Sequence, residues 1–110
     1  MNLPAYAHAS FRDEGLDPAF LGCMKMVGDS MAPEIKPGEW FVFDKQHTMP
    51  SPEGLFVIDG PCGLDVARLQ WRPELKKVTQ SRVNAAYLSV DLDPDAVCVV
   101  GRVVAVMKRV

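Results

Sequence analysis

From Cys23 onward, short apolar runs alternate with turn-forming residues, a pattern typical of β-strands separated by tight turns. Residues 59–63, Asp-Gly-Pro-Cys-Gly, separate two of these runs and predict a hairpin with a glycine-rich turn. The last run is rich in valine and contains Gly101, which favours one long, bent strand. The predicted strands are 23–27, 39–43, 55–58, 64–71 and 97–110, with weaker candidates at 75–79 and 87–90.

Residues 1–22 are expected to form an irregular or weakly helical lead-in to a β core of residues 23–110. Ser10 to Asp13 has the features of a helix start, and Asp17-Pro18 predicts a capped helical turn that runs through Leu21. Strands at this spacing with so little helix indicate a mainly β domain. The length of 110 residues fits one domain, 1–110.

Charge and cysteine content narrow the class of protein. A net charge of −2 argues against this segment binding a phosphate backbone itself, because such binding needs clustered Lys and Arg. The three cysteines, Cys23, Cys62 and Cys98, have neither the number of a disulfide framework nor the spacing of a zinc site, and favour a reducing compartment. No apolar run is long enough to span a bilayer, and Ala7-His8-Ala9 lacks the preceding segments of a signal peptide. We therefore expect a cytoplasmic protein with no membrane partner.

The segment from Val27 to Gly38 is the first candidate for chemistry. Ser30 leaves a predicted strand through Gly28, so its hydroxyl is expected near free backbone N–H groups that could stabilise an oxyanion. A serine in this position equally serves as the cap of the following turn, and the spacing alone favours the cap.

Metal and cofactor sites are not expected. His8 and His47 are far apart and neither has a second ligand at metal-binding spacing. Asp91, Asp93 and Asp95 alternate, but the glycine and distal glutamate of a calcium loop are missing, so a solvated turn is expected. The sequence also has no phosphate loop and no dinucleotide fingerprint.

In combination, several segments resemble the S24 peptidase family, the C-terminal domain of LexA, of lambda-type phage repressors and of UmuD, which shares its fold core with signal peptidases. The resemblance covers residues 16–110 and implies several short, strongly bent antiparallel sheets with one or two short N-terminal helical turns. The segments that carry it are Gly28-Asp29-Ser30-Met31 with Pro33, Ile35 and Gly38, then Trp40 to Phe43, Leu55 to Ile58, Val66-x-Arg68-Leu69 and Val100 to Val104.

The family resemblance implies a serine–lysine dyad. Ser30 would be the nucleophile that attacks a peptide bond in the upstream segment, and backbone N–H groups around Asp29 and Ser30 would form the oxyanion hole. The family carries Val-Lys-Arg-Leu where this chain has Val66-Ala67-Arg68-Leu69, so Ala67 occupies the position of the lysine base. Because a methyl group cannot accept a proton, and losing a general base costs roughly 10²–10⁴-fold, the chain is expected to be inactive as written.

No other residue restores the expected chemistry. Lys36, Lys45, Lys76 and Lys77 lie in predicted turns, loops or a weak strand, and none occupies the position of Ala67. The Ala-Gly pair typical of the family's cleavage sites is absent, and the Cys62-Gly63 pair falls in the predicted hairpin turn. Ala67 is either natural, in a pseudopeptidase, or introduced to disable an excised fragment of a longer regulator, and the sequence leaves both open.

Three functions follow from the resemblance. The first is the self-cleavage and dimerisation domain of a LexA- or phage-repressor-like regulator of the SOS response, with a RecA filament as a further partner. The second is a pseudopeptidase that only dimerises, and the third is a UmuD-like polymerase accessory subunit. The resemblance implies DNA contact only through a helix-turn-helix domain absent from this chain. The first two predict a homodimer through the C-terminal strand, whose apolar run would be buried by pairing at a sheet edge.

Overall fold

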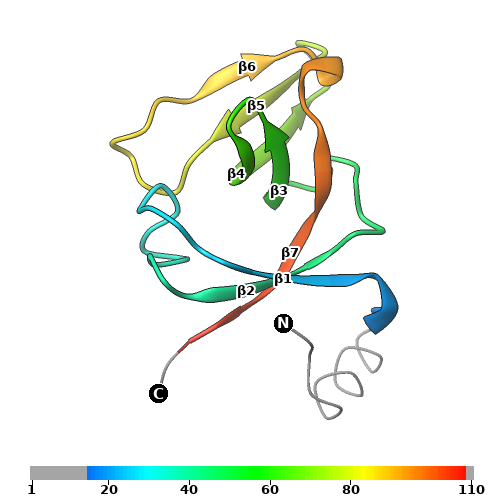
Figure 1. Cartoon of the computed structure of the whole chain (residues 1–110). Helices are drawn as coiled ribbons and strands as arrows, with labels where there is room; N and C mark the ends of the chain where they lie inside the picture. Colours follow the sequence, from blue (N-terminus) through cyan, green and yellow to red (C-terminus); the bar gives the residue numbers. More distant parts are fainter. Residues whose placement is uncertain (1–14, 109–110) are drawn as a thin grey trace.

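The computed structural model describes residues 15–108, whose strands form one antiparallel sheet of seven (Figure 1). The strand order is β1-β2-β7-β3-β4-β5-β6, so the mainly β class predicted from the sequence is confirmed. In chain order the elements are η1 (Pro18–Phe20), β1 (Leu21–Lys25), β2 (Trp40–Asp44), β3 (Gly54–Gly60), β4 (Gly63–Arg72), β5 (Lys77–Ser81), β6 (Val90–Leu92), η2 (Pro94–Ala96) and β7 (Val99–Met107).

The start of the described chain follows the expected capped turn. In η1, a single turn of 3-10 helix, the Asp17 side chain accepts a hydrogen bond from the backbone N–H of Ala19 at 3.0 Å. Strand β1 begins at Leu21, so two residues assigned to the lead-in belong to the β core. The helix start expected at residues 10–13 lies outside the described residues.

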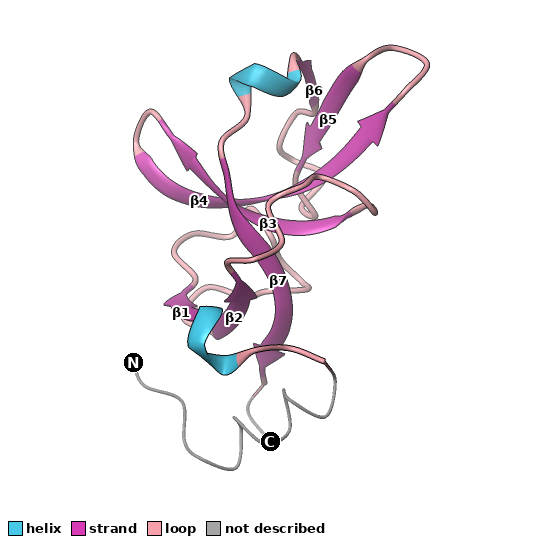
Figure 2. Cartoon of the chain, turned by 90° about the vertical axis from the view of Figure 1, so that its right-hand side faces the viewer, coloured by secondary structure: helices cyan, strands magenta, loops and turns pink. Residues whose placement is uncertain are grey.

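Strand β7 joins the two halves of the sheet. It pairs with β2 over Arg102–Met107 and with β3 over Val99–Arg102, with an irregularity in each pairing. Figure 2 shows β7 running from the β3–β6 half down to β1 and β2. The expectation of several separate sheets is therefore wrong, because one long strand is shared between both halves and makes them continuous.

Gly101 allows β7 to pass close to the backbone of β2. A Cβ atom at this buried glycine would lie 2.5 Å from the carbonyl oxygen of Asp44, far inside contact distance. Glycine at position 101 thus has a steric reason: any side chain here would push β7 away from β2.

The core consists of two clusters on the two faces of the β3–β4 hairpin, because neighbouring residues of a strand point to opposite sides. Val57 and Val66 belong to one, whereas Phe56 and Ala67 belong to the other. The first cluster comprises the buried residues Met26, Met31, Ile35, Phe41, Phe43, Val57 and Val66. The second cluster comprises Phe56, Ile58, Ala67, Leu69 and Val78.

We predict that Gly101→Ala destabilises the protein by roughly 1–3 kcal/mol, the usual cost of forcing an extra group into a packed interior. Urea unfolding monitored by circular dichroism measures the change. Gly60→Ala is the matched control, because its added Cβ meets only the carbonyl oxygen of Gly63, at 3.6 Å. Equal unfolding midpoints for the two variants would contradict the steric role of Gly101.

Candidate functional site

The Ser30 turn, residues 28–38, leaves the end of β1 and returns to β2. Its two ends are held together by backbone hydrogen bonds from Met26 to Glu39 at 2.7 Å and from Gly38 to Met26 at 2.9 Å. Gly28 opens the turn with a φ of +82°, a conformation that favours glycine. Met31 and Ile35 are fully buried in the first cluster, so apolar packing fixes the turn from within.

Ser30 lies almost buried in this turn, with 9% of its surface exposed. Its backbone carbonyl accepts a hydrogen bond from the N–H of Asn84 at 3.0 Å. The side-chain bonds that join the Ser30 turn to the 84–87 turn go to Asp29 and not to the Ser30 hydroxyl. The capping role favoured by the spacing stays a prediction; within the described residues the turn is closed by backbone bonds such as Ala32 to Asp29 at 3.1 Å.

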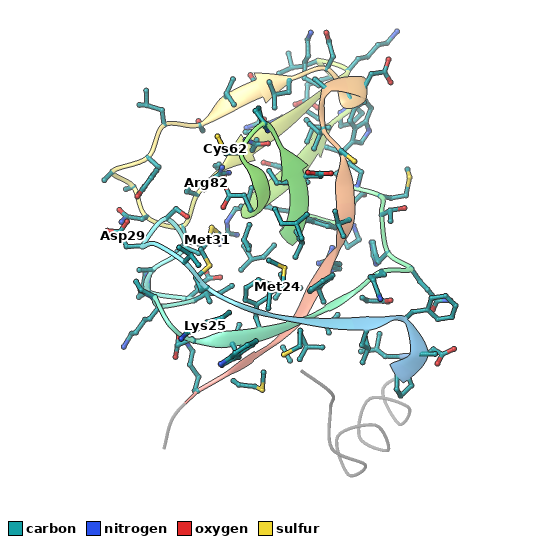
Figure 3. All side chains as sticks on the ribbon, in the orientation of Figure 1. Met24, Lys25, Asp29, Met31, Cys62 and Arg82 are labelled. Carbon is teal, nitrogen blue, oxygen red and sulfur yellow. The ribbon has the colours of Figure 1, made fainter. Side chains whose placement is uncertain are left out.

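Asp29 lies at the rim of the molecule and Met31 points inwards (Figure 3). Within residues 15–108, neither Asp29 nor Ser30 donates its backbone N–H to a backbone carbonyl. An oxyanion hole requires N–H groups that are free to donate beside the nucleophile, so the role implied for Asp29 stays a prediction compatible with this geometry.

The 84–87 turn, between β5 and β6, holds the Ser30 turn from outside. The Asn84 side-chain amide donates to the Asp29 carbonyl at 3.1 Å, and the Tyr87 hydroxyl donates to the Asp29 carboxylate at 2.6 Å. Figure 1 shows the two loops side by side at the left of the molecule. The weaker strand predicted at 87–90 is wrong at Tyr87, because β6 begins only at Val90. Asn84, a residue that favours turns, was the available signal in the sequence.

Ala67 is fully buried in the second cluster, where it pairs with Phe56 of β3. Its neighbour Arg68 instead reaches the Ser30 turn and forms an ion pair with Glu34 at 3.0 Å. The structure therefore links β4 to the Ser30 turn through Arg68, and no hydrogen bond within residues 15–108 joins Ser30 to Ala67.

The end of the Ser30 turn is tied to the end of β7. Lys108 donates to the Glu34 carbonyl at 2.6 Å and to the Glu39 carboxylate at 2.7 Å. The hydrogen bonds from Lys108 and from the backbone N–H of Lys36 lower the pKa of Glu39. The turn is thus held by the 84–87 turn at one end and by β7 at the other.

Metal binding finds no support in the described part of the chain. Within residues 15–108 no group of three or more His, Cys, Asp or Glu side chains could hold a metal ion. Asp91 accepts a hydrogen bond from Thr79 at 2.6 Å and Asp93 pairs with Lys77, so these acids have protein partners. His47 contacts the Ser51 carbonyl at 3.1 Å, and His8 lies outside the described residues.

Comparison with known proteins does not identify the chain. No protein-family model matches it, and no curated protein matches it. Within residues 15–108 no helix has the length and apolarity that crossing a bilayer requires.

We predict that Tyr87 ionises above the ordinary pKa of tyrosine, because the hydrogen bond to Asp29 and the charge of that carboxylate raise the pKa of the phenol. The bond contributes stability below the ordinary tyrosine pKa, and the contribution is lost as pH rises through the raised pKa. Ultraviolet titration of the wild type minus Tyr87→Phe isolates this group from Tyr6. Asp29→Asn should return the titration towards the ordinary value, and an unchanged titration in that variant would refute the contact.

Proposed function

We propose that this chain is the C-terminal domain of a LexA- or phage-repressor-like regulator that keeps the nucleophile Ser30 but has lost its general base. The observation that carries the proposal is the hydroxyl of Ser30 beside the N–H groups of Asp29 and Ser30, in a turn anchored by Met31 and Ile35. A cap would use that hydroxyl in a hydrogen bond, whereas a nucleophile needs it free.

The surroundings of Ser30 support the proposed loss of cleavage. Among residues 15–108, no lysine forms a hydrogen bond or ion pair with it: Lys108 binds Glu34 and Glu39, and Lys77 binds Asp93. The hydroxyl alone is too weak an acid to supply alkoxide at neutral pH. The domain is accordingly proposed to act through association, with cleavage confined to a parent that carries lysine at position 67.

An unpaired strand edge beside a small hollow supports retention of the binding step. The outer edge of β4 is unpaired over residues 63–67, because pairing with β5 begins at Arg68. A hollow of about 60 Å³ lies between this edge and the end of β1, lined by Met24, Val27, Leu64 and Val66 among others. Unpaired strand edges beside an apolar hollow are typical of sites where a peptide adds as a strand.

Association through β7 is proposed in a narrower form than the sequence indicated. β7 lies inside the sheet, so it is not an edge strand along its whole length. Over Val103–Met107 it pairs with β2 alone within the described chain, which leaves its other side open to a second copy. A two-fold pair of such domains would bring together two DNA-binding heads in a repressor-like parent.

The gene sequence distinguishes two origins of Ala67, and with them the first two functions. A natural pseudopeptidase would have alanine at codon 67 of its gene, whereas a disabled fragment of a self-cleaving regulator would have lysine there. A UmuD-like polymerase accessory subunit is the third reading. A RecA filament is proposed as a partner only for the self-cleaving parent.

We predict that Ala67→Lys makes Ser30 reactive towards a fluorophosphonate, which phosphonylates the hydroxyl oxygen and releases fluoride. Burial in the second cluster would lower the pKa of a lysine here. Labelling requires that its long, flexible side chain reach the Ser30 hydroxyl, where the neutral amine would take the proton, and labelling should then increase with pH. The expected gain over the wild type is about 10²–10⁴-fold, measured by mass spectrometry of the labelled protein.

Ala67→Met is the matched control, because it adds similar volume without a base. Ala67→Lys combined with Ser30→Ala identifies the labelled residue. Two results would contradict the proposal: a folded Ala67→Lys protein that stays unlabelled, or an Ala67→Met protein that is labelled equally. Either would mean that Ser30 is not a nucleophile that lacks only a lysine base.

We also predict that the chain sediments as a dimer at micromolar concentration and that Val104→Glu makes it monomeric. Val104 lies at the irregularity between β7 and β2 and packs against neither core cluster, so the charge acts on association rather than folding. Val90→Glu, at the exposed edge strand β6, is the control and should stay dimeric. A monomeric wild type in analytical ultracentrifugation would remove the association proposal.

A further inference from the structure

A second and larger hollow lies away from the Ser30 turn. This cavity, of about 440 Å³, opens between the β3–β4 hairpin turn, β5 and the residues after η2. Ile58 of the second cluster and Val97, which packs against that cluster, form part of its apolar wall together with Leu92. Figure 3 labels Cys62 of the hairpin and Arg82 of the loop after β5, which both line it.

An ion pair forms the polar part of the wall. Arg82 donates from Nη2 to the Asp65 carboxylate at 2.9 Å, and only 16% of the Arg82 side chain is exposed. Within residues 15–108 this is the single hydrogen bond of its guanidinium, so further N–H groups are available to a ligand. Asp65 also accepts the N–H of Val66 at 2.8 Å, and its side chain is 46% exposed.

The side-by-side charges restrict the chemistry of a ligand. A carboxylate would match the planar guanidinium of Arg82, and an ammonium group would match Asp65. An α-amino acid carries both groups on one carbon, which suits two opposite charges held in contact. A phosphate dianion would meet repulsion from Asp65 and from Asp59, which also lines the cavity.

We propose that this cavity binds a free α-amino acid with an apolar side chain, such as leucine. Arg82 holds the carboxylate, Asp65 holds the ammonium group, and Ile58, Leu92 and Val97 surround the side chain. A pocket with an apolar lining and a few convergent polar groups is the usual form of a small-molecule site. The proposal does not rest on the function proposed for Ser30.

The test is a titration of the full chain with L-leucine, monitored by two-dimensional ¹H–¹⁵N NMR. Saturable shifts are expected at Gln80, Arg82 and Val97. Leucinamide lacks the carboxylate and 4-methylpentanoate lacks the ammonium group, so each should bind at least about tenfold more weakly, as expected for losing a charged hydrogen bond. Equal binding of leucine and leucinamide, or shifts that never saturate, would overturn the proposal.

Two variants separate binding from folding. Ala96→Phe enlarges an exposed residue of the cavity lining and leaves the side chains of Arg82 and Asp65 in place, so it should abolish the leucine shifts. Ala19→Phe, the same change at an exposed position outside the cavity lining, should leave them unchanged. Arg82→Lys keeps a positive charge beside Asp65 but loses the planar guanidinium that can bind a carboxylate with two N–H groups. It should therefore weaken the binding of leucine more than the binding of leucinamide. If leucine still shifts the NMR signals of the Ala96→Phe variant, leucine does not bind in this cavity.

Discussion

The shared strand β7 is the constraint on which the rest of the molecule depends. It bonds to β2 with one part and to β3 with the other, and Gly101 lets it pass against the backbone of Asp44. Without that close passage, the two halves would lose the hydrogen bonds that align them. Because each core cluster draws on strands around this junction, the fold tolerates little change in the path of β7.

The Ser30 turn depends on this alignment, because its supports come from both halves. Its ends belong to β1 and β2, but its polar partners Asn84, Tyr87 and Arg68 belong to the other half. Lys108, just beyond β7, adds a further tie through Glu39. A movement between the halves would therefore disturb the Ser30 turn together with the first core cluster, which also draws on both halves.

Short-range signals in the sequence predicted the strands well and their assembly poorly. The alternation of apolar runs and the Gly60–Gly63 turn identify the β3–β4 hairpin, and Asp17-Pro18 identifies the capped turn. The sharing of β7 between two partners needs contacts between residues more than 40 positions apart, which no local pattern encodes. For the same reason, Asn84 and Tyr87 were missed: their role exists only through Asp29, 58 residues before Tyr87.

The burial of Ala67 makes a small apolar residue the one that suits the fold at this position. Its methyl group packs with Phe56 and Leu69 in the second cluster, and a lysine in the same place would carry an amine into apolar surroundings. Such an amine is kept at a functional site only when activity requires it, because it costs stability. Alanine carries no such cost, and the Ser30 turn does not depend on position 67, since its supports come from Met31, Ile35 and the 84–87 turn.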